Sequence, residues 1–298
     1  MSQSISNSNI RAALAPNPGV TQQNQASNNS LGDFIQETSA LTQRLFIQLQ
    51  RRPSTLIAGV IQPFMWLLLF GALFTHAPGG LFGNDLSYAT FLAPGVIVFT
   101  AFSGALNAGL PVMFDREFGF LNRLLVAPLS TRYSIVAAST VYIIALSLVQ
   151  TAVIVAASAL LGAGLPGIAG LSAIAFIVFL IVLGVTALSL ALAFALPGHI
   201  ELIAVIFVTN LPLLFASTAL APLKFMAGWL QVVASLNPLT YAIEPIRYIY
   251  SHGDWAASSI VMDTSWFGFS FSAVILVLLA FDTLILLSIQ PLLRRRFA

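Results

Sequence analysis

The chain has 298 residues, of which 58% are hydrophobic and only 7% are charged, and its mean hydropathy is +0.93. A soluble domain carries about 25% charged residues, so this composition excludes an ordinary soluble enzyme or binding domain. The sequence contains no Cys, which excludes disulfides and thiol chemistry, and its net charge of +2 gives little information because the position of each charge matters more in a membrane protein.

The N-terminal region contains two different segments. Residues 1–30 are rich in Ser, Asn and Gln and cannot bury enough apolar surface to fold, so we expect a disordered cytoplasmic tail. In residues 31–53, apolar side chains recur at helical spacing, Asp33 and Gln36 resemble a capping box, and Pro53 ends the pattern. We expect an amphipathic helix that lies on the inner face of the membrane.

Residues 54–298 predict a transmembrane domain. The segment Tyr133–Ile200 lacks Asp, Glu, Lys and Arg. As a helix it would extend for about 100 Å, enough to cross a ~30 Å hydrocarbon core twice. The expected fold is an all-α integral membrane protein with six transmembrane helices, at about Thr55–Thr75, Tyr88–Met113, Tyr133–Leu161, Ile168–Leu196, Ile200–Leu220 and Trp266–Ile289.

Basic residues set the expected orientation. Ten of the twelve Lys and Arg residues fall on one side of these spans, and only Lys224 and Arg247 fall on the other. Because basic residues are enriched on the cytoplasmic side, we expect a multi-pass protein of the cytoplasmic (inner) membrane with both termini in the cytoplasm.

The segment between the fifth and sixth expected spans is too apolar for a plain loop. Asn237 and Pro238 divide it into two pieces, Leu223–Leu236 and Leu239–Tyr250, each too short to cross a bilayer. We expect two re-entrant half-helices that dip into the outer leaflet and return. An amphipathic surface hairpin is the open alternative.

A charged cluster precedes the third expected span. As a helix, Phe114–Leu125 would place apolar residues on one face and Arg116, Gly119 and Arg123 on the other, and Pro128 would end it. The pattern leaves two interpretations open. One is a cytoplasmic helix that docks into a groove of a soluble partner, and the other is an ordinary interfacial helix.

Two stretches carry a resemblance to a known family. Asp115–Ser130, with its acidic start, Glu117, Gly119 and later Leu-Leu and Pro-Leu-Ser, resembles the cytoplasmic signature of type-2 ABC exporter permeases. Asn237-Pro238-Leu239-Thr240-Tyr241 with the later Arg247 is similar to the outer motif of the same family, and Gln62-Pro63 and Leu92-Ala93-Pro94-Gly95 are similar to its first two spans. The resemblance covers residues 31–296, and the chain looks most like the drug-resistance-type permeases.

This resemblance implies a homodimer of six-span subunits, each docked through a coupling helix to a soluble ABC ATPase that holds ATP and Mg²⁺. The sequence lacks a Gly-x-x-x-x-Gly-Lys-Ser/Thr phosphate loop, so we expect no ATP hydrolysis by this chain. The three His residues are scattered without metal-ligand spacing, so we expect no metal site. We also expect no cofactor in this chain, no enzyme activity and no nucleic-acid partner. The residues that the resemblance assigns to ATPase coupling are Asp115, Arg116, Glu117, Gly119, Leu121, Arg123, Leu124 and Pro128. Those that it assigns to the outer re-entrant motif are Asn237, Pro238, Tyr241, Glu244 and Arg247.

Pro245 departs from the family pattern. It lies between Glu244 and Arg247, and we expect it to kink the second half-helix, which argues against a Glu244–Arg247 pair.

Asp282 is the one carboxylate well inside an expected span. It is either a proton or substrate site or a structural partner of a neighbouring helix. The first of these roles would suit a proton-coupled secondary transporter, which is the alternative to an ABC permease. In either case, spans with so few charges suit an amphipathic substrate, such as a drug-like molecule, a lipid or a lipid-linked glycan.

Overall fold

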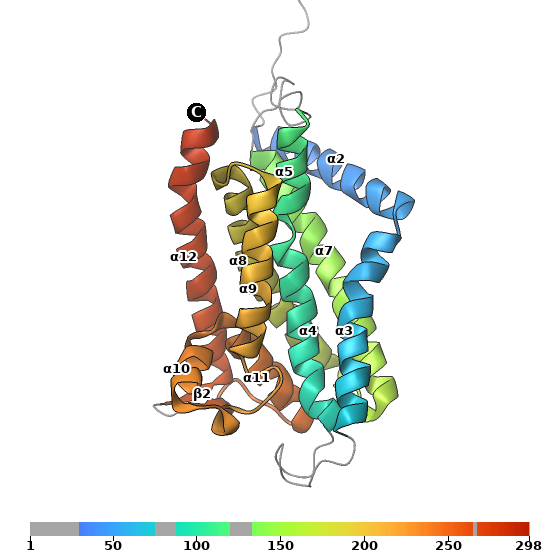
Figure 1. The fold of residues 1–298 in the computed structure, drawn as a ribbon, viewed down its shortest axis with the longest axis vertical. Helices are drawn as coiled ribbons and strands as arrows, with labels where there is room; N and C mark the ends of the chain where they lie inside the picture. Colours follow the sequence, from blue (N-terminus) through green and yellow to red (C-terminus); the bar gives the residue numbers. More distant parts are fainter. Residues whose placement is uncertain (1–29, 75–87, 120–132, 265–266, 298) are drawn as a thin grey trace, which may run out of the picture.

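The computed structural model describes residues 30–74, 88–119, 133–264 and 267–297. Long apolar helices run between two ends of the molecule (Figure 1). One end holds α2, α5 and the C-terminal end of α12, and the other holds α10, α11 and a short hairpin. The elements in chain order are α2 (Ser30–Arg51), α3 (Ser54–Leu73), α4 (Tyr88–Leu106), α5 (Gly109–Glu117), α7 (Tyr133–Ser158), η1 (Ala159–Ala163), α8 (Ile168–Ala195), α9 (His199–Phe215), η2 (Leu223–Phe225), α10 (Gly228–Leu236), α11 (Pro238–Ser251), β1 (Ile260–Asp263), β2 (Gly268–Ser270) and α12 (Phe271–Phe297).

Five segments of the described residues are long and apolar enough to cross a membrane: α3, α4 with α5, α7 with η1, α8, and α12. The uncharged run Tyr133–Ile200 folds as the two long helices α7 and α8, as predicted. The fifth expected span corresponds to α9, which has 17 residues and ends at Phe215 rather than Leu220. At 1.5 Å per residue it is about 25 Å long, so a sixth crossing stays a prediction.

The amphipathic helix expected near the N-terminus is present as α2, which crosses one end of the bundle obliquely (Figure 1). It packs on α7, where the rings of Phe46 and Tyr142 meet edge to face and Ser134 donates a 2.8 Å hydrogen bond to Glu37. Its placement on a membrane surface stays a prediction, and the tail predicted for residues 1–30 lies outside the described residues except for Ser30.

The second expected span is interrupted. α4 ends at Leu106 and α5 begins at Gly109, and Ser189 of α8 bridges the break by donating to the Leu106 carbonyl (2.6 Å) and accepting from the Gly109 N–H (2.9 Å). A side chain at Gly109 would collide with the Ser189 backbone, so α5 and α8 approach closely here. The helix then continues to Glu117, four residues beyond the predicted end at Met113.

The segment between α9 and α12 contains two short helices, α10 and α11, close to the predicted pieces. Their depth in a membrane is untested. The described residues are mostly helical, as expected for an all-α membrane protein, and β1 and β2 add one short two-stranded antiparallel hairpin that was not predicted. The last helix begins at Phe271 rather than at the predicted Trp266, because Gly268–Ser270 forms a strand of the hairpin.

Candidate functional site

The prediction of one continuous helix over Phe114–Leu125 is wrong. α5 ends at Glu117, and Phe118 is its C-cap residue. The next residue, Gly119, has a φ of 74°. This left-handed conformation favours glycine and is typical of the residue just after a helix. Four of the predicted coupling residues, Leu121, Arg123, Leu124 and Pro128, lie outside the described residues.

Arg116 does not project away from the bundle, as the helical pattern had predicted. Its guanidinium donates to the carbonyls that end α8: Nη1 to Ala193 (2.8 Å) and Phe194 (3.4 Å), and Nη2 to Leu196 (2.6 Å) and Pro197 (2.7 Å). The last carbonyls of a helix have no partner within it, and a cation is favourable at that end. Arg116 therefore caps α8 from a different helix.

Glu117 makes the equivalent contact with the start of α9. Its Oε1 accepts the backbone N–H of His199 (2.6 Å), and its Oε2 lies 2.5 Å from His199 Nδ1. The N-cap residue of α9 is Gly198, which has no side chain, so Glu117 supplies the acceptor and the negative charge that a helix N-terminus favours. A Cβ at Gly198 would lie 2.9 Å from Glu117 Oε1, so the absence of a side chain makes room for this contact.

Asp115 contacts a third element. Its carboxylate lies 3.8 Å from the guanidinium of Arg44 on α2, and both side chains are more than a third exposed. An exposed ion pair of this kind contributes only about 0–1 kcal/mol, so it adds little to the stability of the fold.

We call Asp115, Arg116 and Glu117 the charged hub. The three residues are consecutive, yet they contact α2, the end of α8 and the start of α9 in turn. A displacement of the end of α5 would therefore act on three other helices at once. The sequence motif indicated the importance of these residues but not their partners, which lie 71 to 82 positions away in the chain.

The second set of motif residues lies at the opposite end of the bundle. Asn237 caps α11 by accepting the Leu239 N–H (3.0 Å), and its Nδ2 donates to the carbonyls of Leu213 (2.7 Å) and Ala216 (2.6 Å) at the end of α9. Pro238 occupies the first turn of α11, where its missing N–H costs nothing. Tyr241 is buried and meets the ring of Phe269 in β2 edge to face at 5.6 Å.

Glu244 and Arg247 do pair, although Pro245 lies between them, because α11 stays helical through the proline. Arg247 also donates to the carbonyls of Thr218 (2.5 Å) and Phe91 (3.3 Å), and its guanidinium lies 4.0 Å from the centre of the Phe91 ring. Burial lowers the pKa of Arg247 below its ordinary value, and the Glu244 carboxylate opposes this shift. The arginine thus joins α11 to α4 and to the turn after α9.

Asp282 lies where α12 packs on α8. The residue is 4% exposed, and its carboxylate fits against Gly184 at the place where a Cβ would stand. Among the described residues, no basic side chain pairs with it.

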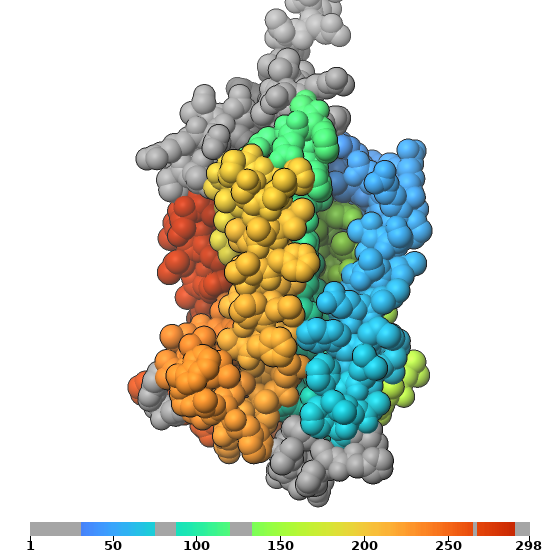
Figure 2. Space-filling model, viewed as in Figure 1, coloured from blue at the N-terminus to red at the C-terminus, as the bar shows by residue number. Residues whose placement is uncertain are grey.

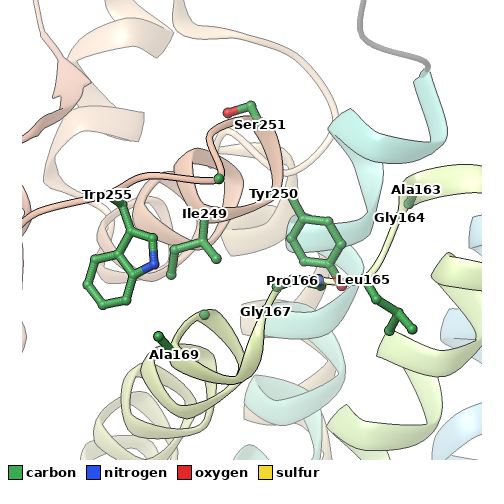
Figure 3. Close-up of a pocket in the computed structure, with 12 residues that line it drawn as sticks. Ala163, Gly164, Leu165, Pro166, Gly167, Ala169, Ile249, Tyr250, Ser251 and Trp255 are labelled. Atoms are coloured by element: carbon green, nitrogen blue, oxygen red, sulfur yellow. The ribbon is translucent and has the colours of Figure 1, made fainter.

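A cavity of about 200 Å³ lies between the turn Ala163–Gly170 and the end of α11 (Figure 3). Tyr250 and Trp255 line it, and the Tyr250 hydroxyl lies 3.3 Å from the hydroxyl of Ser158 on α7. No sequence motif predicted a site in this region. Its Gly- and Pro-rich turn was the available signal, but such turns mark helix connections far more often than sites.

Several long apolar helices, one carrying a charged hub at its end, define a multi-pass membrane protein. The comparison with known families identifies which kind. Residues 36–251 match the family described as "ABC-2 type transporter". Since the match covers most of the chain, the protein belongs to this family of ABC transport permeases, and the family implies an ABC ATPase as partner.

Relatives support the assignment. The chain is 57% identical over 252 residues to a "Putative transport permease ycf38" of Porphyra purpurea, covering 85% of this chain and 87% of that protein. It is 51% identical over 276 residues to the protein of the same name in Cyanophora paradoxa, covering 92% and 95%. A more distant relative, 25% identical over 227 residues and covering 74% and 79%, is the "Probable doxorubicin resistance ABC transporter permease protein DrrC" of Mycobacterium tuberculosis.

Proposed function

We propose that this chain is the membrane subunit of an ABC exporter, which moves an amphipathic substrate across the cytoplasmic membrane while a separate ABC ATPase hydrolyses ATP. The observation that carries the proposal is the charged hub. Asp115, Arg116 and Glu117 end a helix that continues the second span, and they contact α2, α8 and α9. A partner that moves the segment after Gly119 would shift these helices together.

The proposal assigns docking to the stretch that begins at the hub and runs to Pro128. The ATPase holds ATP and Mg²⁺, and two copies of the permease form a homodimer with both termini in the cytoplasm. The contacts of Arg116 and Glu117 favour α8 and α9 as the first helices to respond.

The substrate class follows from the composition of the spans. With few charged groups at depth, a path through this chain suits an amphipathic molecule, such as a drug-like compound, a lipid or a lipid-linked glycan. The printed name of the mycobacterial relative associates that protein with doxorubicin resistance, which makes multidrug efflux one member of the proposed class.

A second candidate function rests on Asp282. A buried carboxylate that pairs with no basic side chain of the described residues is a group that could carry a proton, as a proton-coupled secondary transporter requires.

Co-expression with a candidate ABC ATPase distinguishes the two functions. We expect the permease to co-purify with the ATPase, to hydrolyse no ATP alone, and to transport a lipophilic fluorescent dye in vesicles only with ATP. We also expect Asp282→Asn, which keeps the size of the side chain, to leave ATP-driven transport intact. Transport that needs a proton gradient instead of ATP, and that Asp282→Asn abolishes, would establish the secondary transporter and contradict the ABC exporter.

A further inference from the structure

α9 is packed along a single narrow stripe. Of its 17 residues, only Leu202, Ile206 and Leu214 are buried, and they recur every four or eight positions on one face. Beside and opposite this stripe the helix is open, with Phe207 and Val208 each 73% exposed, and Figure 2 shows α9 (gold) uncovered along its length between its neighbours.

The start of α9 is held by the charged hub. Glu117 accepts the His199 N–H and meets the His199 ring, in the gap left by Gly198. Midway along, Ser103 of α4 donates a 3.1 Å hydrogen bond to Asn210. The polar attachment at the start thus comes from one of the two sequence motifs.

The end of α9 is held by the other motif. Asn237 donates to the carbonyls of Leu213 and Ala216, and Arg247 donates to the carbonyl of Thr218 just beyond. Asn237 is 4% exposed, so its two bonds to α9 are shielded from solvent. Terminal carbonyls of a helix lack partners of their own, so these donors fix where the end of α9 lies.

We propose that α9 transmits movement of the charged hub to the half-helices α10 and α11, and that Asn237 and Arg247 are positioning residues at its far end. α9 stays helical over its length of about 25 Å, although Pro212 near its far end removes one N–H from the backbone hydrogen-bond ladder. Side chains from the two motifs hold its ends, and between them α9 contacts the bundle through the narrow stripe and the Ser103–Asn210 hydrogen bond. The inference rests on the proposed function, because the ATPase supplies the movement.

The chain has no Cys, so single reporters can be introduced cleanly. Ile200→Cys places a spin label at the start of α9, where the native side chain is 70% exposed, and Trp229→Cys places one on α10, where it is 72% exposed. Both are measured in the full permease–ATPase complex in lipid nanodiscs, with and without ATP and vanadate. We expect the spectra of both labels to change on addition of ATP and vanadate.

Two variants then remove the hydrogen bonds from Asn237 to the end of α9. Asn237→Ser keeps a side-chain acceptor for the Leu239 N–H but cannot reach α9, and Asn237→Asp keeps the size and the acceptor but cannot donate. In each we expect the label at position 200 to respond as before and the label at position 229 to lose its response. Ser259→Ala removes a 3.1 Å hydrogen bond from the Ala256 N–H in the same end of the molecule and should leave both responses intact.

The outcomes separate the two claims. An unchanged response at position 229 in both Asn237 variants overturns the role of α9, and so does a wild-type complex in which only position 200 responds. A chain that binds no ABC ATPase, or whose position 200 ignores ATP, overturns the proposed function and the inference with it.

Discussion

Arg116→Ala is expected to lower transport by about 10- to 150-fold while the chain still inserts into the membrane. The guanidinium donates to four carbonyls at and just beyond the end of α8, and the variant leaves all of them without this partner. A hydrogen bond to a charged group contributes about 1.5–3 kcal/mol, and 1.4 kcal/mol corresponds to a tenfold change in an equilibrium. Dye transport in vesicles of matched protein content measures the effect.

Arg116→Lys provides the graded control for this prediction. Lysine keeps the charge, but its ammonium is a compact donor. It cannot donate to all four carbonyls that the planar guanidinium reaches. We expect its transport rate to lie between those of the wild type and the alanine variant. Wild-type transport in Arg116→Ala would mean that the cap on α8 has no part in the transport cycle.

Gly95→Ala is expected to destabilise the protein by about 1–3 kcal/mol, the usual cost of overpacking. A Cβ at Gly95 in α4 would lie 2.6 Å from the carbonyl oxygen and 2.8 Å from the Cα of Ala219, so the backbone of the turn after α9 would have to shift. Thermal stability in detergent, followed by size-exclusion chromatography after heating, measures the loss.

Gly71→Ala is the matched control on α3. Among the described residues, no atom beyond its chain neighbours and the nearby backbone of α3 lies within 4 Å of the place where its Cβ would stand. Alanine in a helix is favoured over glycine by roughly 0.5–1 kcal/mol. The control variant should therefore be as stable as the wild type or slightly more so. Equal stability of the two variants would show that the backbone at Ala219 can shift to accept the new Cβ without a loss of stability.

The long apolar runs could be predicted from the sequence because each carries its own signal. Tyr133–Ile200 has no charged residue and folds as two helices, and the break at Asn237-Pro238 separates α10 from α11 as expected. Helix ends were harder to predict. Neither the continuation of α5 to Glu117 nor the interruption at Asn107 follows from hydropathy, because both depend on partners in α8 and α9.

The charged hub shows where pattern reasoning fails physically. Helical periodicity placed Arg116 on a face directed away from the bundle, but a sequence pattern cannot show which element lies beside that face. Arg116 lies within α5, and the end of α8 is close enough for the guanidinium to donate to its carbonyls. The Glu244–Arg247 pair was doubted on the basis of Pro245, yet a proline removes only one N–H and leaves the side chains three residues apart on one face.

The number of transport events per ATP hydrolysed tests most directly the claim that the charged hub couples the ATPase to this chain. The informative variant is Glu117→Gln, which keeps the shape of the side chain but removes the charge at the start of α9. Glu201→Gln removes the same charge from the first turn of α9, and Glu201 is exposed. The account predicts that Glu117→Gln hydrolyses ATP at the wild-type rate with a reduced transport ratio, while Glu201→Gln keeps both. An unchanged ratio in Glu117→Gln would contradict it.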